Sequence, residues 1–211
     1  MNKSNSMPSR CCAPPPPPEH GHLSLRRIID IYKDNPACCC HTDYENLAGT
    51  LDFVCGKHNE QKLPDDGLRY LKHPHQRCFS NRQINQLTEV LEKVPLDQLG
   101  DFDRIHEKVM AANPVGFNFL GYYDFCLRYC FNKRIFPQRY VYIHRGALAG
   151  AGHLRDAGLL KFSNKEHRIP LEAFPQEIID GLYNFEDMGT FHIENFLCVM
   201  EAHLSHLKTT K

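Results

Sequence analysis

The sequence predicts an all-α protein, a multi-helix bundle with at most a minor pair of short strands. In most segments apolar residues recur at i, i+3, i+4 and i+7, which places them on one face of a helix. Only residues 139–144 have the composition of a strand, and strands nowhere alternate with helices along the chain. The 211 residues, 42% hydrophobic and 24% charged, have an ordinary composition for a globular domain.

The chain divides into a tail and one domain. Residues 1–22 hold five consecutive prolines, which favour an extended polyproline II conformation, and few groups that a core would bury. We therefore expect 1–22 to be a Pro-rich flexible tail and 23–207 to be a single all-α domain. Within that domain, 114–168 is a hairpin and basic segment and 171–203 is an acidic C-terminal segment.

The first two helices of the domain are predicted at 24–35 and 42–55. Ser24 can cap the first helix, and a Thr or Asp at 42–43 can cap the second. Their apolar stripes are Leu25, Ile28, Ile29 and Tyr32 in the first, and Leu47, Leu51, Val54 and Cys55 in the second. The Pro-Asp-Asp-Gly sequence at 64–67 indicates a turn or the start of a short helix.

Three further helices are predicted before the strand-like segment. Ser80 can cap a helix that Pro95 ends, a second helix covers 102–113, and a third covers 119–131 after a proline and a glycine. The inward-facing residues of the first two are Ile84, Leu87, Val90, Leu91, Phe102, Ile105, Val109 and Met110. A helix of small residues, Ala147, Ala149, Gly150, Ala151 and Gly152, then allows close approach to another backbone.

Charge is distributed unevenly along a chain whose total is zero. Residues 128–168 hold nine Lys or Arg against two acidic residues, which leaves +7. Residues 171–203 hold seven acidic residues and no Lys or Arg, which leaves −7. The basic segment would suit an anionic partner, most often phosphate. The alternative is that the two segments pair with each other in the fold.

Five of the ten cysteines occur in two adjacent runs, at 11–12 and 38–40, and neither a signal peptide nor an apolar run long enough to span a membrane is present. We therefore expect reduced thiols, a cytoplasmic protein and no membrane partner. Cysteine and histidine spacings between 38 and 78 are similar to zinc-ligand spacings, but Cys55 and His58 fall on or beside a helix with an apolar stripe. The prediction is no bound metal and no cofactor.

The layout of 114–154 resembles the helix-hairpin-helix core of DNA glycosylases. In that family a hairpin of the form L-P-G-[IV]-G grips a DNA phosphate, and V-D-x-H follows about twenty-five residues later. Here the hairpin corresponds to residues 114–118, and 141–144 corresponds to the second motif. Asn118 replaces the second glycine, Leu120 stands where some members have a lysine nucleophile, and Tyr142 replaces the catalytic aspartate. The resemblance implies the fold and DNA contact without glycosidic cleavage.

The sequence also resembles an uncharacterised family of bacterial proteins that we expect to share this degenerate core. The resemblance covers roughly 26–205. It rests on His73-Pro74-His75-Gln76, the segment from Gly116 to Asp124, Arg128, Val141-Tyr142-Ile143-His144-Arg145-Gly146 and Ile193-Glu194-Asn195-Phe196-Leu197-Cys198. It supports the fold and implies no particular activity.

Polar side chains within apolar runs are the candidate site residues. Asp124 and Arg128 are spaced to form an ion pair on one helix, which would be a structural role. Asp124, Tyr142 and His144 are weak catalytic candidates, in which the carboxylate would orient the imidazole as a general base. The residues expected to contact phosphate are Gly116, Asn118, Arg128, Lys133, Arg134, Arg139 and Arg145.

These observations favour a nucleic-acid-binding protein, without catalysis, that contacts duplex DNA through its phosphates. One alternative is an interaction or assembly subunit of a bacterial multi-component system, which would bind a protein through the acidic segment or the Pro-rich tail. Another is an enzyme that uses Asp124, Tyr142 and His144 on an unidentified substrate.

Overall fold

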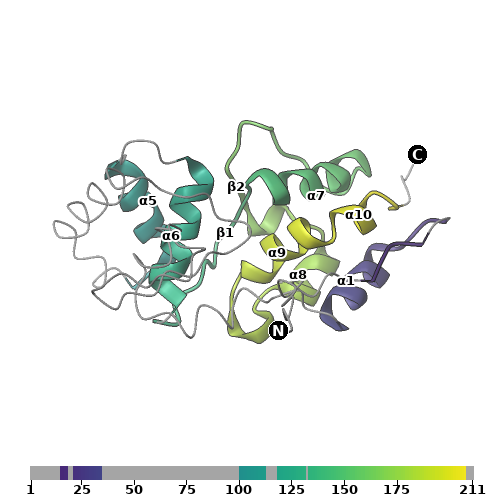
Figure 1. Ribbon diagram of the computed structural model, residues 1–211, viewed down its shortest axis with the longest axis horizontal. Coiled ribbons are helices and arrows are strands. Elements are labelled where there is room, and N and C mark those ends of the chain that lie inside the picture. The colour runs from purple at the N-terminus through teal and green to yellow at the C-terminus, as the bar shows by residue number, and fades with distance from the viewer. Residues whose placement is uncertain (1–14, 19–20, 35–99, 113–117, 132, 208–211) are drawn as a thin grey trace, which may run out of the picture.

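The computed structural model describes residues 15–18, 21–34, 100–112, 118–131 and 133–207 (Figure 1). These residues form seven α-helices, two 3₁₀ helices and one two-stranded sheet, so the predicted helical class with a minor strand pair is confirmed. The helices predicted at 42–55 and 80–94 lie outside the described residues, as do residues 113–117 of the predicted hairpin. Of the described helices, none is long and apolar enough to cross a bilayer.

Helix α1, Leu25–Asp34, forms where the sequence predicts it. Its four stripe residues are buried, and the Ser24 hydroxyl accepts a hydrogen bond from the Arg27 N–H at 3.3 Å. This stripe packs into the larger of two hydrophobic clusters, together with α7 (Arg145–Asp156), α8 (Gln176–Leu182), α9 (Phe191–Val199) and α10 (Glu201–Leu204). The 3₁₀ helices, Leu171–Ala173 and Phe185–Asp187, precede α8 and α9.

Helices α5, Phe102–Ala112, and α6, Phe119–Phe131, pack against each other and form a second cluster. A side chain caps the N-terminus of each helix. It provides an acceptor for N–H groups that have no partner within the helix. Asp101 accepts from the Asp103 N–H at 2.8 Å, and Asn118 accepts from the Gly121 N–H at 2.9 Å. Cys126 and Cys130 are buried in this cluster as free thiols, as the sequence predicts.

The two strands lie between the two helical groups (Figure 1). Strand β1, Tyr140–Tyr142, pairs antiparallel with β2, Arg168–Pro170, with Tyr142 opposite Arg168. Val141 and Ile169 point into the large cluster, whereas Tyr142 belongs to the small one. The strand pair therefore joins the two cores and holds Tyr142 against α5 and α6.

Two close approaches fix the larger cluster. Helices α7 and α9 touch at Gly150, where a Cβ atom would overlap the carbonyl oxygen of Leu197 and lie 2.8 Å from its carbonyl carbon. Ala147 and Ala151 are fully buried on the same helix, so the predicted close approach is confirmed at these residues and Gly150, but not at Gly152, where an added Cβ would meet no atom within 4 Å. Beyond α10, the Leu23 N–H donates to the His206 carbonyl at 2.9 Å, and Leu23 forms a parallel bridge with Leu207.

Candidate functional site

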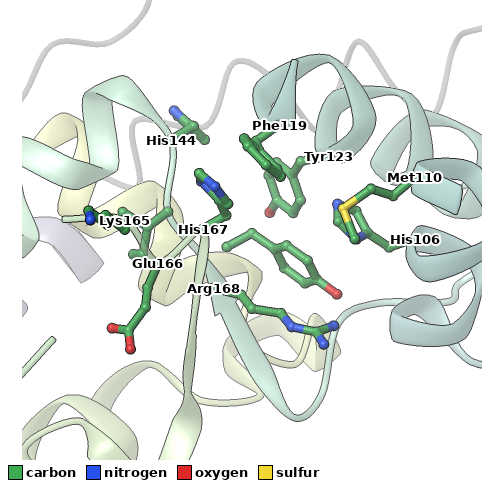
Figure 2. A pocket seen from close by; sticks show the side chains of 11 residues that line it. His106, Met110, Phe119, Tyr123, His144, Lys165, Glu166, His167 and Arg168 are labelled. Atoms are coloured by element: carbon green, nitrogen blue, oxygen red, sulfur yellow. The ribbon is translucent and has the colours of Figure 1, made fainter. Parts of the chain in front are cut away.

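A pocket of about 330 Å³ lies where α5, α6 and the strand pair meet (Figure 2). Helix α5 contributes two side chains, α6 two, the segment from β1 into α7 three, and the segment leading into β2 four. The lining residues are His106, Met110, Phe119, Tyr123, Tyr142, Ile143, His144, Lys165, Glu166, His167 and Arg168.

Aromatic rings form most of the pocket wall. Tyr123 and Tyr142 stack with their centroids 5.1 Å apart and an interplanar angle of 21°. Phe119, on the first turn of α6, stacks on His167 and remains 39% exposed. Phe119 therefore keeps part of its ring open at the pocket. Tyr123 and Tyr142 are 2% and 3% exposed, so Phe119 is the one of these three rings that a planar ligand could readily reach.

Tyr142 is held in place by a buried carboxylate. Its hydroxyl donates to Asp103 Oδ1 at 2.7 Å, and Arg139 Nε donates to Asp103 Oδ2 at 3.1 Å. Asp103 is 1% exposed, so these two donors satisfy a carboxylate that water scarcely reaches. Burial and the adjacent Asp103 charge raise the pKa of Tyr142 well above its usual value. Tyr142 is therefore a neutral, fixed ring.

His106 stands three residues after Asp103 on α5 and borders the same Tyr142 ring. Its centroid lies 4.5 Å from that of Tyr142, and the residue is 4% exposed. Neither ring nitrogen has a hydrogen-bond partner among the described residues. Burial, with the charge of Arg168, lowers the pKa of His106 to about 4. The imidazole is therefore neutral at physiological pH.

Among the described residues, His144, unlike His106, has a carboxylate partner. Its Nε2 pairs with a carboxylate oxygen of Glu194 on α9, and both side chains are mostly buried. Burial disfavours the charged imidazole, but the charge and hydrogen bond of Glu194, with the charge of Asp124, leave the pKa of His144 raised. The catalytic candidates Asp124 and His144 are thus within electrostatic reach of each other, and Glu194 is the closer partner. Glu194 is not among the catalytic candidates predicted from the sequence.

The predicted phosphate contacts have diverse surroundings. Gly116 lies outside the described residues, and so do the side chains of Arg128 and Arg145. Asn118 caps α6 with its side-chain oxygen. Lys133 and Arg134 are exposed, and the Arg134 guanidinium lies 5.6 Å from the centroid of Phe136. Of the predicted residues, the pocket includes Tyr142 and His144 but none of the described phosphate-contact candidates.

Part of the basic segment is paired, although mostly not with the acidic C-terminal segment. Arg139 meets Asp103 at 3.1 Å and Asp101 at 3.5 Å, and Arg168 Nη1 meets Glu107 Oε1 at 3.0 Å. These three carboxylates belong to α5 or its cap. Of the ion pairs seen in the described parts of the chain, His144 with Glu194 is the one that joins the two segments.

Neither pocket residue of α5, His106 or Met110, is among the site residues predicted from the sequence. The residue four positions after Phe102 is His106, so its imidazole falls within the apolar stripe that predicts the helix. A polar ring in a buried stripe is a signal for a functional histidine, but a weak one. Asp103 lies next to that stripe on α5. Its partner Tyr142 is 39 residues away, so no local sequence pattern indicates the hydrogen bond between them.

Comparisons with known protein families, curated proteins and solved structures find no match to this chain. In the described parts of the chain, no three His, Cys, Asp or Glu side chains are grouped closely enough to hold a metal ion. The cysteines and histidines weighed as zinc ligands, between 38 and 78, lie outside the described residues.

Proposed function

We propose that the protein binds nucleic acid, without breaking a glycosidic bond, and that its pocket holds one unstacked base. The observation that carries this proposal is the aromatic wall of a pocket that also contains Lys165 and Arg168. A single strand bound by stacking requires flat rings for its bases and nearby positive charge for its phosphates. This pocket supplies the rings, and Lys165 supplies the positive charge, because Arg168 is paired with Glu107.

The charge pattern favours a single strand over a duplex. Arg139 and Arg168 already have carboxylate partners, so they would release fewer counterions from a phosphate backbone than free side chains would. Stacking on the exposed ring of Phe119 would then provide a larger share of the affinity. We expect binding to weaken with salt, but less steeply than for a protein with an unpaired basic track.

The same surroundings oppose glycosidic cleavage. Tyr142 occupies the position that the glycosylase resemblance assigns to the catalytic aspartate, and it has no carboxylate. The nearest carboxylate is Asp103, which the Tyr142 hydroxyl and Arg139 both engage. An oxocarbenium-like transition state needs a carboxylate that faces the sugar. Binding without cleavage is the function that these contacts support.

Two exposed aromatic residues provide a matched test. Phe119, in the pocket, is 39% exposed, and Tyr183, which does not line the pocket, is 37% exposed. Fluorescence anisotropy with a labelled single-stranded oligonucleotide should show that Phe119→Ala weakens binding about tenfold, because one stacking surface is lost. Tyr183→Ala should leave it unchanged. Equal effects of the two variants, or no binding at low salt, would refute the proposal.

A second candidate, an enzyme acting on a ligand of the same pocket, is favoured by the His144–Glu194 pair. A carboxylate that orients an imidazole is the arrangement general acid–base catalysis uses. Incubation with RNA and DNA oligonucleotides, followed by denaturing gels, tests it. Products formed by the natural protein and not by His144→Ala would establish the enzyme, and their absence would leave the binding function.

A further inference from the structure

His106 combines three properties that its packing alone does not explain. It lines the pocket, it is 4% exposed, and neither of its ring nitrogens has a hydrogen-bond partner among the described residues. Buried polar groups in native proteins are nearly always paired, so each unpaired one requires an explanation. Asp103, three residues earlier on the same helix, is fully satisfied by two donors. The missing partner is therefore not shared by the other buried polar side chain of α5, Asp103.

The described neighbours of His106 hold its ring at the pocket wall without hydrogen-bonding its nitrogens. Tyr142 lies against it at 4.5 Å with an interplanar angle of 53°. Figure 2 shows His106 and Met110 side by side on the α5 wall, facing the side on which Phe119 and Tyr123 lie. A planar ligand that stacks on the aromatic wall would bring its edge toward this imidazole.

The protonation state of His106 defines what it can bind. With the pKa lowered to about 4, the ring is neutral and has one N–H donor and one acceptor nitrogen. Either tautomer can meet a neutral polar group on a ligand edge. An apolar ring of the same shape would leave the nitrogens unpaired, which is the usual basis for strong discrimination by a buried polar group.

We infer that His106 is the specificity-determining residue of the pocket and hydrogen-bonds the polar edge of a neutral heterocyclic base. The inference rests on the proposed function, because it names the contact that recognises the base. The stacking rings would accept any planar ring, since every base has a π-face. His106 would restrict the pocket to rings that have hydrogen-bonding groups at their edge.

An isosteric base tests this contact. Three oligonucleotides that differ at one central position are compared by anisotropy: thymine, its apolar isostere 2,4-difluorotoluene, and an abasic site. The natural protein should bind thymine about five- to tenfold more tightly than the isostere, the range expected for one hydrogen bond. His106→Phe should bind the two equally, because it keeps a ring and removes the nitrogens. His153→Phe, a change of the same kind on α7 outside the pocket, should keep the preference.

The possible outcomes distinguish a failure of the role assigned to His106 from a failure of the proposed nucleic-acid binding. If the natural protein prefers both rings over the abasic site but does not distinguish thymine from the isostere, the base is held and the role of His106 is wrong. A preference for thymine over the isostere that persists in His106→Phe would also show that the role assigned to His106 is wrong. Equal affinity for all three oligonucleotides, or no binding, refutes the proposed function itself and the inference with it. The isostere comparison uses the natural protein, so it remains decisive even if His106→Phe fails to fold.

Discussion

Gly150 and Gly152 lie two residues apart on α7, yet the structure predicts opposite effects of replacing each with alanine. At Gly150 an added Cβ would lie 2.8 Å from the Leu197 carbonyl carbon and 2.9 Å from its Cα, and backbone atoms cannot rotate away. At Gly152 an added Cβ would meet no atom within 4 Å. Since both positions are inside the helix, the helix propensity gained by the substitution is the same.

The expected change in stability follows from the helix propensity gained and the steric overlap introduced by each substitution. The Gly152→Ala variant should gain only the propensity and entropy term, about 0.5–1 kcal/mol in the free energy of unfolding. The Gly150→Ala variant gains the same amount but must separate α7 from α9, and overpacking of a dense core costs about 1–3 kcal/mol and occasionally more. We expect the upper end or beyond, because two backbones collide. The two variants should therefore differ by about 3 kcal/mol.

Urea unfolding followed by circular dichroism measures both variants and the natural protein under one condition. For a domain of this size, 1 kcal/mol shifts the melting temperature by roughly 2–4 °C, so thermal melts provide a second estimate. We expect Gly152→Ala to melt above the natural protein and Gly150→Ala well below it. If Gly150→Ala is as stable as the natural protein, the α7–α9 contact is not as close as described and the reasoning fails.

Three further predictions concern the pocket. Tyr142→Phe removes the donor to buried Asp103, so urea unfolding should show a loss of about 2 kcal/mol; an unchanged stability would contradict the hydrogen bond. As pH falls from about 6.5 to about 4 the unfolded chain takes up the His106 proton before the native state does, so about 3 kcal/mol of stability should disappear across that window. Unfolding at pH 7 and 4.5 should show a smaller loss in His106→Phe, and an identical loss would disprove the assignment. Tyr142→Asp should release no base from damaged oligonucleotides and should be less stable, because it adds a carboxylate beside Asp103; base release detected as alkali-labile strand breaks would contradict this.

Local patterns predicted the described helices well where an apolar stripe was regular. The α1 stripe, its Ser24 cap and the bounds of α6 are confirmed, because each depends on residues within a few positions of one another. Strand β1 was recognisable from β-branched and aromatic residues, and its partner β2 was not. A three-residue strand such as Arg168–Pro170 has too little sequence to show a period.

The pocket itself was beyond such patterns because it is assembled from four distant segments. Tyr142 was singled out for its likeness to a glycosylase motif, whereas its partner Asp103 depends on how α5 packs against β1. The basic segment likewise pointed to an external anion, and the structure pairs Arg139 and Arg168 with acids of α5. Side-chain pairing across 36 to 61 residues follows from tertiary packing, which periodicity does not encode.

The bridge between Leu23 and Leu207 has a consequence for the order in which the protein acquires its structure during synthesis. Helix α1 leaves the ribosome before its packing partners, because its buried face packs into a cluster completed by α8, α9 and α10, more than a hundred residues later. At typical elongation rates of about 5–20 residues per second, several seconds pass before those partners exist. During that interval α1 exposes Ile28, Ile29 and Tyr32, which is the kind of surface that general chaperones shield.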